Sequence, residues 1–236
     1  MLNDNGKITI TVDGEERTRM DVATAQVDRA YKMLTRYKEK LGPEGFKELF
    51  KDEIRQTADK YIALAKASDP AKAKTARAEF YVKNCRIKDY LFAYLTTKPS
   101  DESHPEHINV GITPKGAEVI EFVGNDVTPM VFLMKRGEDA GVPEQYVEDE
   151  DTDFCLKAGM FDEETGESFG MYAFHQFKQL ENGDLKVSNC IIFPEKTDDT
   201  IVSGQAEHLM IEFYNWLTRA SQASAPAEFK PPFPVK

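Results

Sequence analysis

Cysteine is scarce in this sequence, and long apolar runs are absent from it. Its three cysteines (Cys85, Cys155 and Cys190) are widely separated and lack a CxxC spacing, which excludes a full disulfide framework and a cysteine-based zinc motif. We expect them to be buried, reduced thiols. Apolar runs such as Met130–Met134 are far too short to cross a bilayer, and the first residues lack the apolar segment of a secretory signal. The sequence therefore predicts a cytoplasmic protein without a membrane partner.

The short motifs of common enzyme classes are also missing. No glycine-rich phosphate loop ending in Gly-Lys-Ser/Thr occurs, and GxGxxG, GxSxG and HExxH are absent. Histidine is scarce as well, with four in the chain. Pro105 lies between His104 and His107 and prevents a regular helix from presenting both, and no cysteine nearby completes a ligand set. We therefore expect neither a metal nor a cofactor, and no motif assigns a catalytic residue.

The two parts of the chain differ in charge, and positive residues are few in the second part. Residues 1–97 hold 19 Lys and Arg against 15 Asp and Glu, whereas residues 98–236 hold 11 against 26. The first part is therefore weakly basic and the second strongly acidic, with a total of −11. This sign argues against a protein that coats duplex nucleic acid over its whole surface.

The first half of the chain has the patterns of a short ribbon and three helices. Alternating apolar residues before Asp13-Gly14 predict a β-ribbon in residues 1–17. The helical region covers residues 18–97, and residues 98–107 are predicted to be a linker. Its helices are expected from Thr18 to Leu41, from Pro43 to about Ala65, and over residues 70–96.

The second half has the period-2 pattern of an antiparallel sheet. Six strands are predicted, in residues 108–112, 117–123, 130–135, 153–161, 169–180 and 184–194. A helix of residues 204–221, capped by Ser203, places Trp216 on a wide apolar face that is expected to cover the sheet. The domain of residues 108–222 is followed by a proline-rich tail, residues 223–236. The predicted fold class is therefore α+β.

Two features favour a non-catalytic protein that binds another protein, as an adaptor, inhibitor or assembly factor. The first is the acidic segment of residues 138–153, which contains no Lys or Arg. Asp149, Asp151 and Asp153 copy only part of a calcium-loop spacing, because Phe154 stands where that loop needs glycine. The second is the tail, whose spaced phenylalanines fit a partner groove or the protein's own body, although a tail of this composition is also expected to be disordered in solvent. The candidate partner-binding residues are Glu148, Asp149, Glu150, Asp151, Asp153, Phe229 and Phe233.

Two other functions remain open from the sequence. The predicted third helix interleaves cations with aromatic residues, a pattern that binds single-stranded DNA or RNA but also arises when long side chains flank a buried face. Its candidate residues are Lys72, Lys83, Arg86 and Tyr90. The other alternative is an enzyme whose site forms around His175, for example with Cys155 or Cys190. His208 is predicted to be a surface or boundary residue.

The predicted first helix carries one apolar seam. Met20, Ala23, Val27, Ala30, Leu34, Tyr37 and Leu41 follow one another at alternating spacings of three and four residues. Such a seam fits packing against the protein's own core, and it also fits a coiled-coil homodimer.

Overall fold

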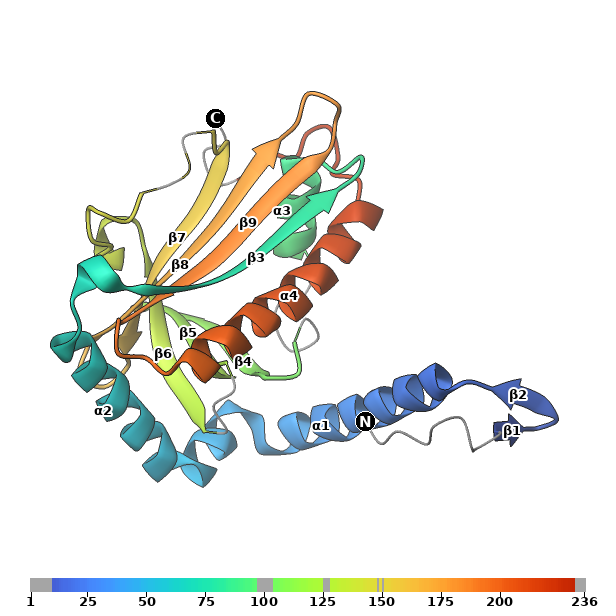
Figure 1. Cartoon of the computed structure of the whole chain (residues 1–236), viewed down its shortest axis with the longest axis horizontal. Coiled ribbons are helices and arrows are strands. Elements are labelled where there is room, and N and C mark those ends of the chain that lie inside the picture. The colour runs from blue at the N-terminus through green and yellow to red at the C-terminus, as the bar shows by residue number, and fades with distance from the viewer. Residues whose placement is uncertain (1–9, 97–103, 125–127, 148, 150, 232–236) are drawn as a thin grey trace. The chain divides into compact units, whose positions relative to one another are not determined.

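Two compact units, Met1–Gly42 and Pro43–Lys236, make up the chain (Figure 1). The structure is a computed structural model that describes residues 10–96, 104–124, 128–147, 149 and 151–231. Among these residues, no helix combines the length and the hydrophobicity that crossing a bilayer requires.

The first unit contains a two-stranded ribbon followed by a helix. β1 (Ile10–Val12) pairs antiparallel with β2 (Glu15–Arg17), and positive φ angles at Asp13 and Gly14 close the turn between them. α1 (Arg19–Leu49) begins with a capping box. In it the Asp21 N–H donates to Thr18 Oγ1, and the Thr18 N–H donates to Asp21 Oδ2. The turn and the capping pair lie at the predicted positions.

α1 is interrupted where the two units meet in the sequence. Gly42 has a φ of 63° and a ψ of 172°, which are not helical, and Pro43 follows it. Glycine adopts this positive φ without the steric cost that a side chain would add. The helical segment of the first unit therefore ends before Gly42, and the remaining turns of α1 belong to the second unit.

The second unit combines helices with a long antiparallel sheet. Its further helical elements are α2 (Lys51–Ala67), η1 (Pro70–Lys72), α3 (Ile87–Thr96), η2 (Gly137–Ala140) and α4 (Asp199–Gln222). Its strands are β3 (Lys74–Val82), β4 (His107–Thr113), β5 (Gly116–Phe122), β6 (Pro129–Arg136), β7 (Phe154–Asp162), β8 (Ser168–Gln179) and β9 (Leu185–Phe193). In the described residues these seven strands form one sheet in the order β3-β9-β8-β7-β6-β5-β4, and every neighbouring pair is antiparallel. The α+β class is confirmed.

The seventh strand, β3, corrects the prediction of a third helix over residues 70–96. Ala76, Ala78, Phe80 and Val82 point inward at alternate positions, while the residues between them are exposed. Ala76 and Phe80 also fit a helical stripe, which explains the error. All nine residues of β3 pair with β9. The segment forms a strand because the backbone N–H and C=O groups that face β9 find hydrogen-bond partners there. Only α3 remains of the predicted helix.

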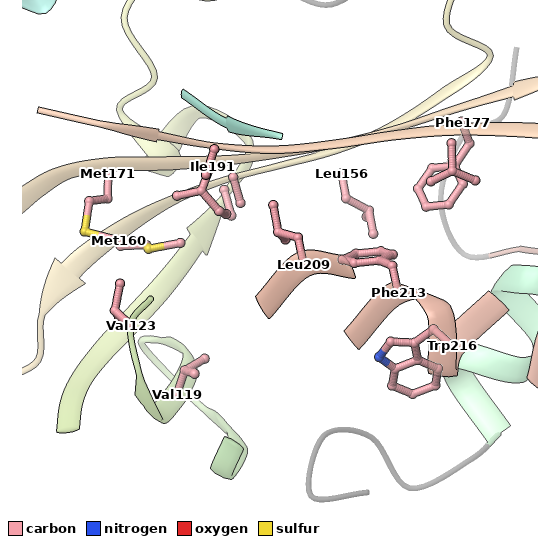
Figure 2. Packing of buried hydrophobic residues seen from close by; sticks show 14 of the residues in the cluster. Val119, Val123, Leu156, Met160, Met171, Phe177, Ile191, Leu209, Phe213 and Trp216 are labelled. Carbon is pink, nitrogen blue, oxygen red and sulfur yellow. The ribbon is translucent and has the colours of Figure 1, made fainter. Parts of the chain in front are cut away.

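The C-terminal helix packs across the inner face of the sheet (Figures 1 and 2). Leu209 and Phe213 project from α4 toward the sheet, where residues such as Ile191 and Leu156 meet them, whereas the ring of Trp216 lies on the side of α4 away from these strands and packs against Tyr94 of α3. Trp216 is 2% exposed, so its predicted burial is confirmed. The helix begins earlier than predicted, because Asp198 caps it by accepting the Thr200 N–H at 2.8 Å, in place of Ser203.

Candidate functional site

A cavity of about 750 Å³ lies between the inner face of the sheet and α4. Small side chains on the central strands leave the space: Ala158 of β7 stands directly opposite Ala173 of β8, which in turn stands opposite Ile191 of β9. The larger apolar side chains of the lining include Tyr90, Val119, Phe132, Leu156, Met160, Leu209, Phe213 and Trp216. The wall is therefore mainly apolar, and it belongs entirely to the second unit.

Polar side chains gather at one part of this wall. His107 is the first residue of β4, Glu121 lies on the neighbouring strand β5, and His208 and Glu212 lie on α4. All four line the cavity. His107 and His208 are 4% and 3% exposed, so they are held away from bulk water.

The face of α4 that lines the cavity brings His208 and Glu212 together. These residues are four positions apart, and Gln205 lies one turn earlier on the same face. Gln205 Oε1 accepts the backbone N–H of Gly124 at 2.8 Å, which ties α4 to the chain just after β5. A Cβ at Gly124 would lie 2.2 Å from the Ile201 carbonyl oxygen, so only glycine allows this close approach.

The histidines and carboxylates of the polar wall are in direct contact. His107 Nε2 and His208 Nε2 are 3.0 Å apart, and Glu121 Oε2 is 3.2 Å from the same nitrogen of His107. Glu106 Oε2 is 2.8 Å from His208 Nδ1, and Glu212 Oε2 is 3.9 Å from His208 Nε2. Five side chains from β4, β5, α4 and the segment before β4 thus share one network.

The contacts of His208 determine which of its nitrogens carries the proton. A carboxylate can only accept, so the Nδ1 atom next to Glu106 carries the donated proton. Burial opposes ionisation of Glu121, but its hydrogen bond to His107 and the charges of His107 and His208 hold its pKa below the usual value. Glu121 is consequently ionised near pH 7.

His104 packs against His208 and contacts the backbone of Glu106. Its ring stacks on that of His208 at a centroid distance of 3.9 Å, and its Nδ1 accepts the Glu106 backbone N–H at 3.1 Å. Three of the four histidines of the chain therefore meet at one place, although His104 and His107 are about a hundred residues away from His208 in the sequence. The prediction that His208 is a surface or boundary residue is wrong.

His175 lies in the cavity wall but does not form the suggested pair with a cysteine. Cys155 is opposite Gln176 and Cys190 is opposite Phe174, so both thiols lie on the other face of the sheet. Burial, reinforced by the charge of Arg136, lowers the pKa of His175 to about 4, so the ring is neutral near pH 7. A cysteine–histidine enzyme site is therefore contradicted by the strand register.

The cationic residues suggested for nucleic-acid binding do not share a helix. Lys72 is in η1, Lys83 is in the turn after β3, and Arg86 precedes α3. Arg86 donates to both carboxylate oxygens of Asp89, at 2.7 and 2.6 Å. Tyr90 is 1% exposed and its ring packs against Phe177 at 4.5 Å, so it offers no face on which a base could stack. The predicted continuous basic helix does not exist.

The described residues of the acidic segment make contacts within the chain. Gln176 Oε1 accepts the Asp149 N–H at 2.7 Å, and Asp153 Oδ2 accepts the Gln179 N–H at 2.8 Å. Asp151 is exposed. Glu148 and Glu150 lie outside the described residues.

The described part of the C-terminal tail lies along its own body. Phe229 packs against Phe92 of α3 with ring centroids 5.3 Å apart, and the buried carboxylate of Asp89 accepts the Ala225 N–H at 2.9 Å. Phe229 therefore has a partner within this chain, one of the three possibilities that the sequence left open. Phe233 lies outside the described residues.

Few local patterns in the sequence indicate the polar wall. No motif marks Glu106, Glu121 or Glu212, because each stands in an ordinary linker, strand or helix pattern. The one available signal was the alignment of Gln205, His208 and Glu212 on a single helix face, where polar residues interrupt an otherwise apolar stripe.

No model of a protein family matches this sequence, and no curated protein matches it. Among solved structures, Ara h 8.0201 is 13% identical with a TM-score of 0.39, and major latex-like protein 151 from Panax ginseng is 12% identical with a TM-score of 0.36. In both cases the match covers 64% of this chain and 96% of the other. The hypothetical protein jhp0584 from Helicobacter pylori is 10% identical over 63% of this chain and 86% of its own, with a TM-score of 0.37. Similarities at this level do not assign a function, which has to be argued from the residues of this chain.

Proposed function

We propose that this protein binds one small, mainly apolar molecule in the cavity between the sheet and α4. The observation that carries the proposal is the cavity itself: about 750 Å³ is within the range of roughly 300–1,000 Å³ that small-molecule sites occupy. Its wall is apolar, with a few convergent polar groups at one place, which is the usual composition of such a site. The bound molecule places its apolar part against α4 and the sheet, and a polar group near His107 and His208.

Filling the cavity tests this proposal. Ala158→Leu and Ala173→Leu each add an apolar side chain where space is available, so we expect the affinity for an apolar fluorescent probe such as anilinonaphthalene sulfonate to fall at least about tenfold. The melting temperature should stay close to that of the wild type, because the new side chains enter empty volume.

The single tryptophan provides a second readout, since Trp216 lines the cavity and its fluorescence should change when the probe binds. Ala63→Leu adds the same side chain to the exposed surface of α2 and should leave binding unchanged. Equal probe affinity in the wild type and both cavity variants would show that the cavity is not the binding site.

The exposed seam on the first unit supports a second proposal, self-association with another copy of this chain. In the helical segment of residues 19–41, Met20, Val27, Leu34 and Leu41 repeat every seven residues, with Ala23, Ala30 and Tyr37 between them. Met20, Val27 and Tyr37 are 71%, 53% and 59% exposed. A strict seven-residue repeat is the spacing of a coiled-coil seam, and a second copy would cover these side chains.

A charge placed in the seam should prevent this association. Val27→Glu brings two carboxylates together in an apolar dimer seam, so we expect the dissociation constant, measured by sedimentation equilibrium, to rise at least about tenfold. Ala25→Glu introduces the same charge on the opposite side of the helix and should leave the constant unchanged. A wild-type protein that is monomeric at high micromolar concentration would refute the dimer.

A further inference from the structure

We propose that His107, His208 and Glu212 form a binding site for a divalent transition-metal ion of the zinc type in the wall of the cavity. One nitrogen from each histidine and one carboxylate oxygen of Glu212 lie within 4.8 Å of one another. The sequence-based expectation of no metal considered the His104–His107 segment and the acidic run of Asp149, Asp151 and Asp153, each by itself. The fold adds the missing ligands from α4, so the basis of that expectation no longer holds.

The distances between these atoms suit a single small ion. With zinc–ligand bonds of about 2.0–2.1 Å, the ligand atoms of a tetrahedral site are about 3.3–3.4 Å apart. The two Nε2 atoms are 3.0 Å apart, and Glu212 Oε2 is 3.9 Å from His208 Nε2. The ligand atoms of the third pair, His107 and Glu212, lie within 4.8 Å of each other, so binding of one ion requires the side chains to rotate toward it. Two imidazoles with one carboxylate favour zinc-type ions over magnesium and calcium, which prefer oxygen ligands alone.

Glu106 gives His208 the orientation of a metal ligand. Its carboxylate accepts the proton of Nδ1 at 2.8 Å, which leaves the lone pair on the Nε2 atom that faces His107. Metal-bound histidines characteristically donate their other ring nitrogen to a carboxylate in this way. Stacking of His104 on His208 restrains the ring further. Glu106 is therefore a positioning residue.

The charge of the site also favours a cation. His107 Nε2 lies 3.0 Å from His208 Nε2 and 3.2 Å from Glu121 Oε2. Without a metal, a single proton lies between the two histidine nitrogens. The carboxylates of Glu106, Glu121 and Glu212 surround these two largely buried imidazoles. A dication compensates this charge better than a shared proton does.

Within the part of the chain that the structure describes, a second combination of donors lies near His208, and it is less suitable for a metal ion. Its members are His104, Glu106 and His208. The Nδ1 atom of His104 already accepts the Glu106 N–H, and the Nδ1 atom of His208 donates to the Glu106 carboxylate. In contrast, His107, His208 and Glu212 all line the cavity, so a fourth coordination position can face a bound molecule. The metal site does not depend on the proposed ligand, because an ion can bind while the cavity is otherwise empty.

Titration of the metal-free full-length protein with Zn²⁺, followed by calorimetry, tests the site. We expect one equivalent to bind with a dissociation constant of about 1 µM or lower, and the melting temperature to rise with Zn²⁺ concentration. With Co²⁺, the visible absorption of a four- or five-coordinate complex should appear. Absence of saturable binding of either ion at about 100 µM would overturn the proposal.

Variants identify the ligands. His107→Gln, His208→Gln and Glu212→Gln retain side-chain size and should each raise the dissociation constant at least about tenfold to a hundredfold. His175→Gln is the matched control, because His175 lines the same cavity outside the proposed site and should leave Zn²⁺ affinity within about threefold of the wild type. Glu212 is partly exposed, so Glu212→Gln should fold even if a histidine variant does not. The loss of Zn²⁺ affinity can then still be measured.

The positioning role of Glu106 has its own readout. Glu106→Gln should weaken Zn²⁺ binding about tenfold and alter the Co²⁺ spectrum, while Glu106→Asp should restore part of the affinity. Unchanged Zn²⁺ affinity in both His107→Gln and His208→Gln would show that the ion binds elsewhere and would refute the assignment.

Discussion

Trp216→Ala is expected to lower the free energy of unfolding by about 3–5 kcal/mol, the range observed for large aromatic side chains removed from a protein core. The indole is 2% exposed, and its ring lies 5.2 Å from that of Tyr94 of α3. The Arg219 guanidinium covers it at 5.4 Å. Because Trp216 joins α4, α3 and the cavity wall, the surrounding side chains can close only part of the space that the ring leaves.

Urea denaturation followed by far-ultraviolet circular dichroism measures this change without relying on the fluorophore that is removed. Tyr214→Ala is the control, since Tyr214 lies two residues away on α4 and is 65% exposed, so its loss should cost less than about 1 kcal/mol. Native emission at the wavelength of a solvent-exposed indole, or equal midpoints for both variants, would contradict the placement of Trp216.

Gly159→Ala should destabilise the protein by about 3 kcal/mol, at the upper end of the usual cost of overpacking. A Cβ at this position of β7 would lie 2.0 Å from the Ala140 carbonyl oxygen and 3.0 Å from a ring carbon of Phe161. Ala140 is fully buried at the end of η2, so the clash is with backbone that cannot move without disturbing this helix.

Gly111→Ala provides the matched comparison in β4. There the nearest atom to the added Cβ is a side-chain nitrogen of Asn109 at 3.3 Å, which can rotate away, so the change should stay within about 1 kcal/mol. Chemical denaturation of both variants gives the two free energies. Similar stability losses in the two strands would show that the close approach of η2 to β7 is not retained in solution.

Much of the sheet could be predicted from the sequence, because alternation and turn chemistry are local properties. The turn at Asn182-Gly183 connects β8 and β9, with a φ of 86° at Gly183, and the six predicted strands end within two residues of the observed ones. The width of the apolar face on the last helix likewise indicated that Trp216 is buried.

Local patterns failed where one set of residues fits two periods. Ala76 and Phe80 satisfy both a helical stripe and a strand, and only the free edge of β9 decides between them. The basic helix disappears for this reason, and with it the exposed position of Tyr90. Intrinsic preference is weak at such positions, so tertiary hydrogen bonding determines the structure.

The cavity and its polar wall were decided by the tertiary structure alone. The sequence contains the alternation that places Ala158 and Ala173 on the inner face, but only the strand register sets them opposite each other and leaves space beneath α4. His107 and His208 are 101 residues apart, and nothing near either one indicates the other. Their contact exists because α4 packs against β3, α3 and β9 and turns one face toward the cavity, where His208 meets His107 of β4. Composition and periodicity thus determined the elements and their buried faces, whereas the distances on which binding chemistry depends came from how those elements pack.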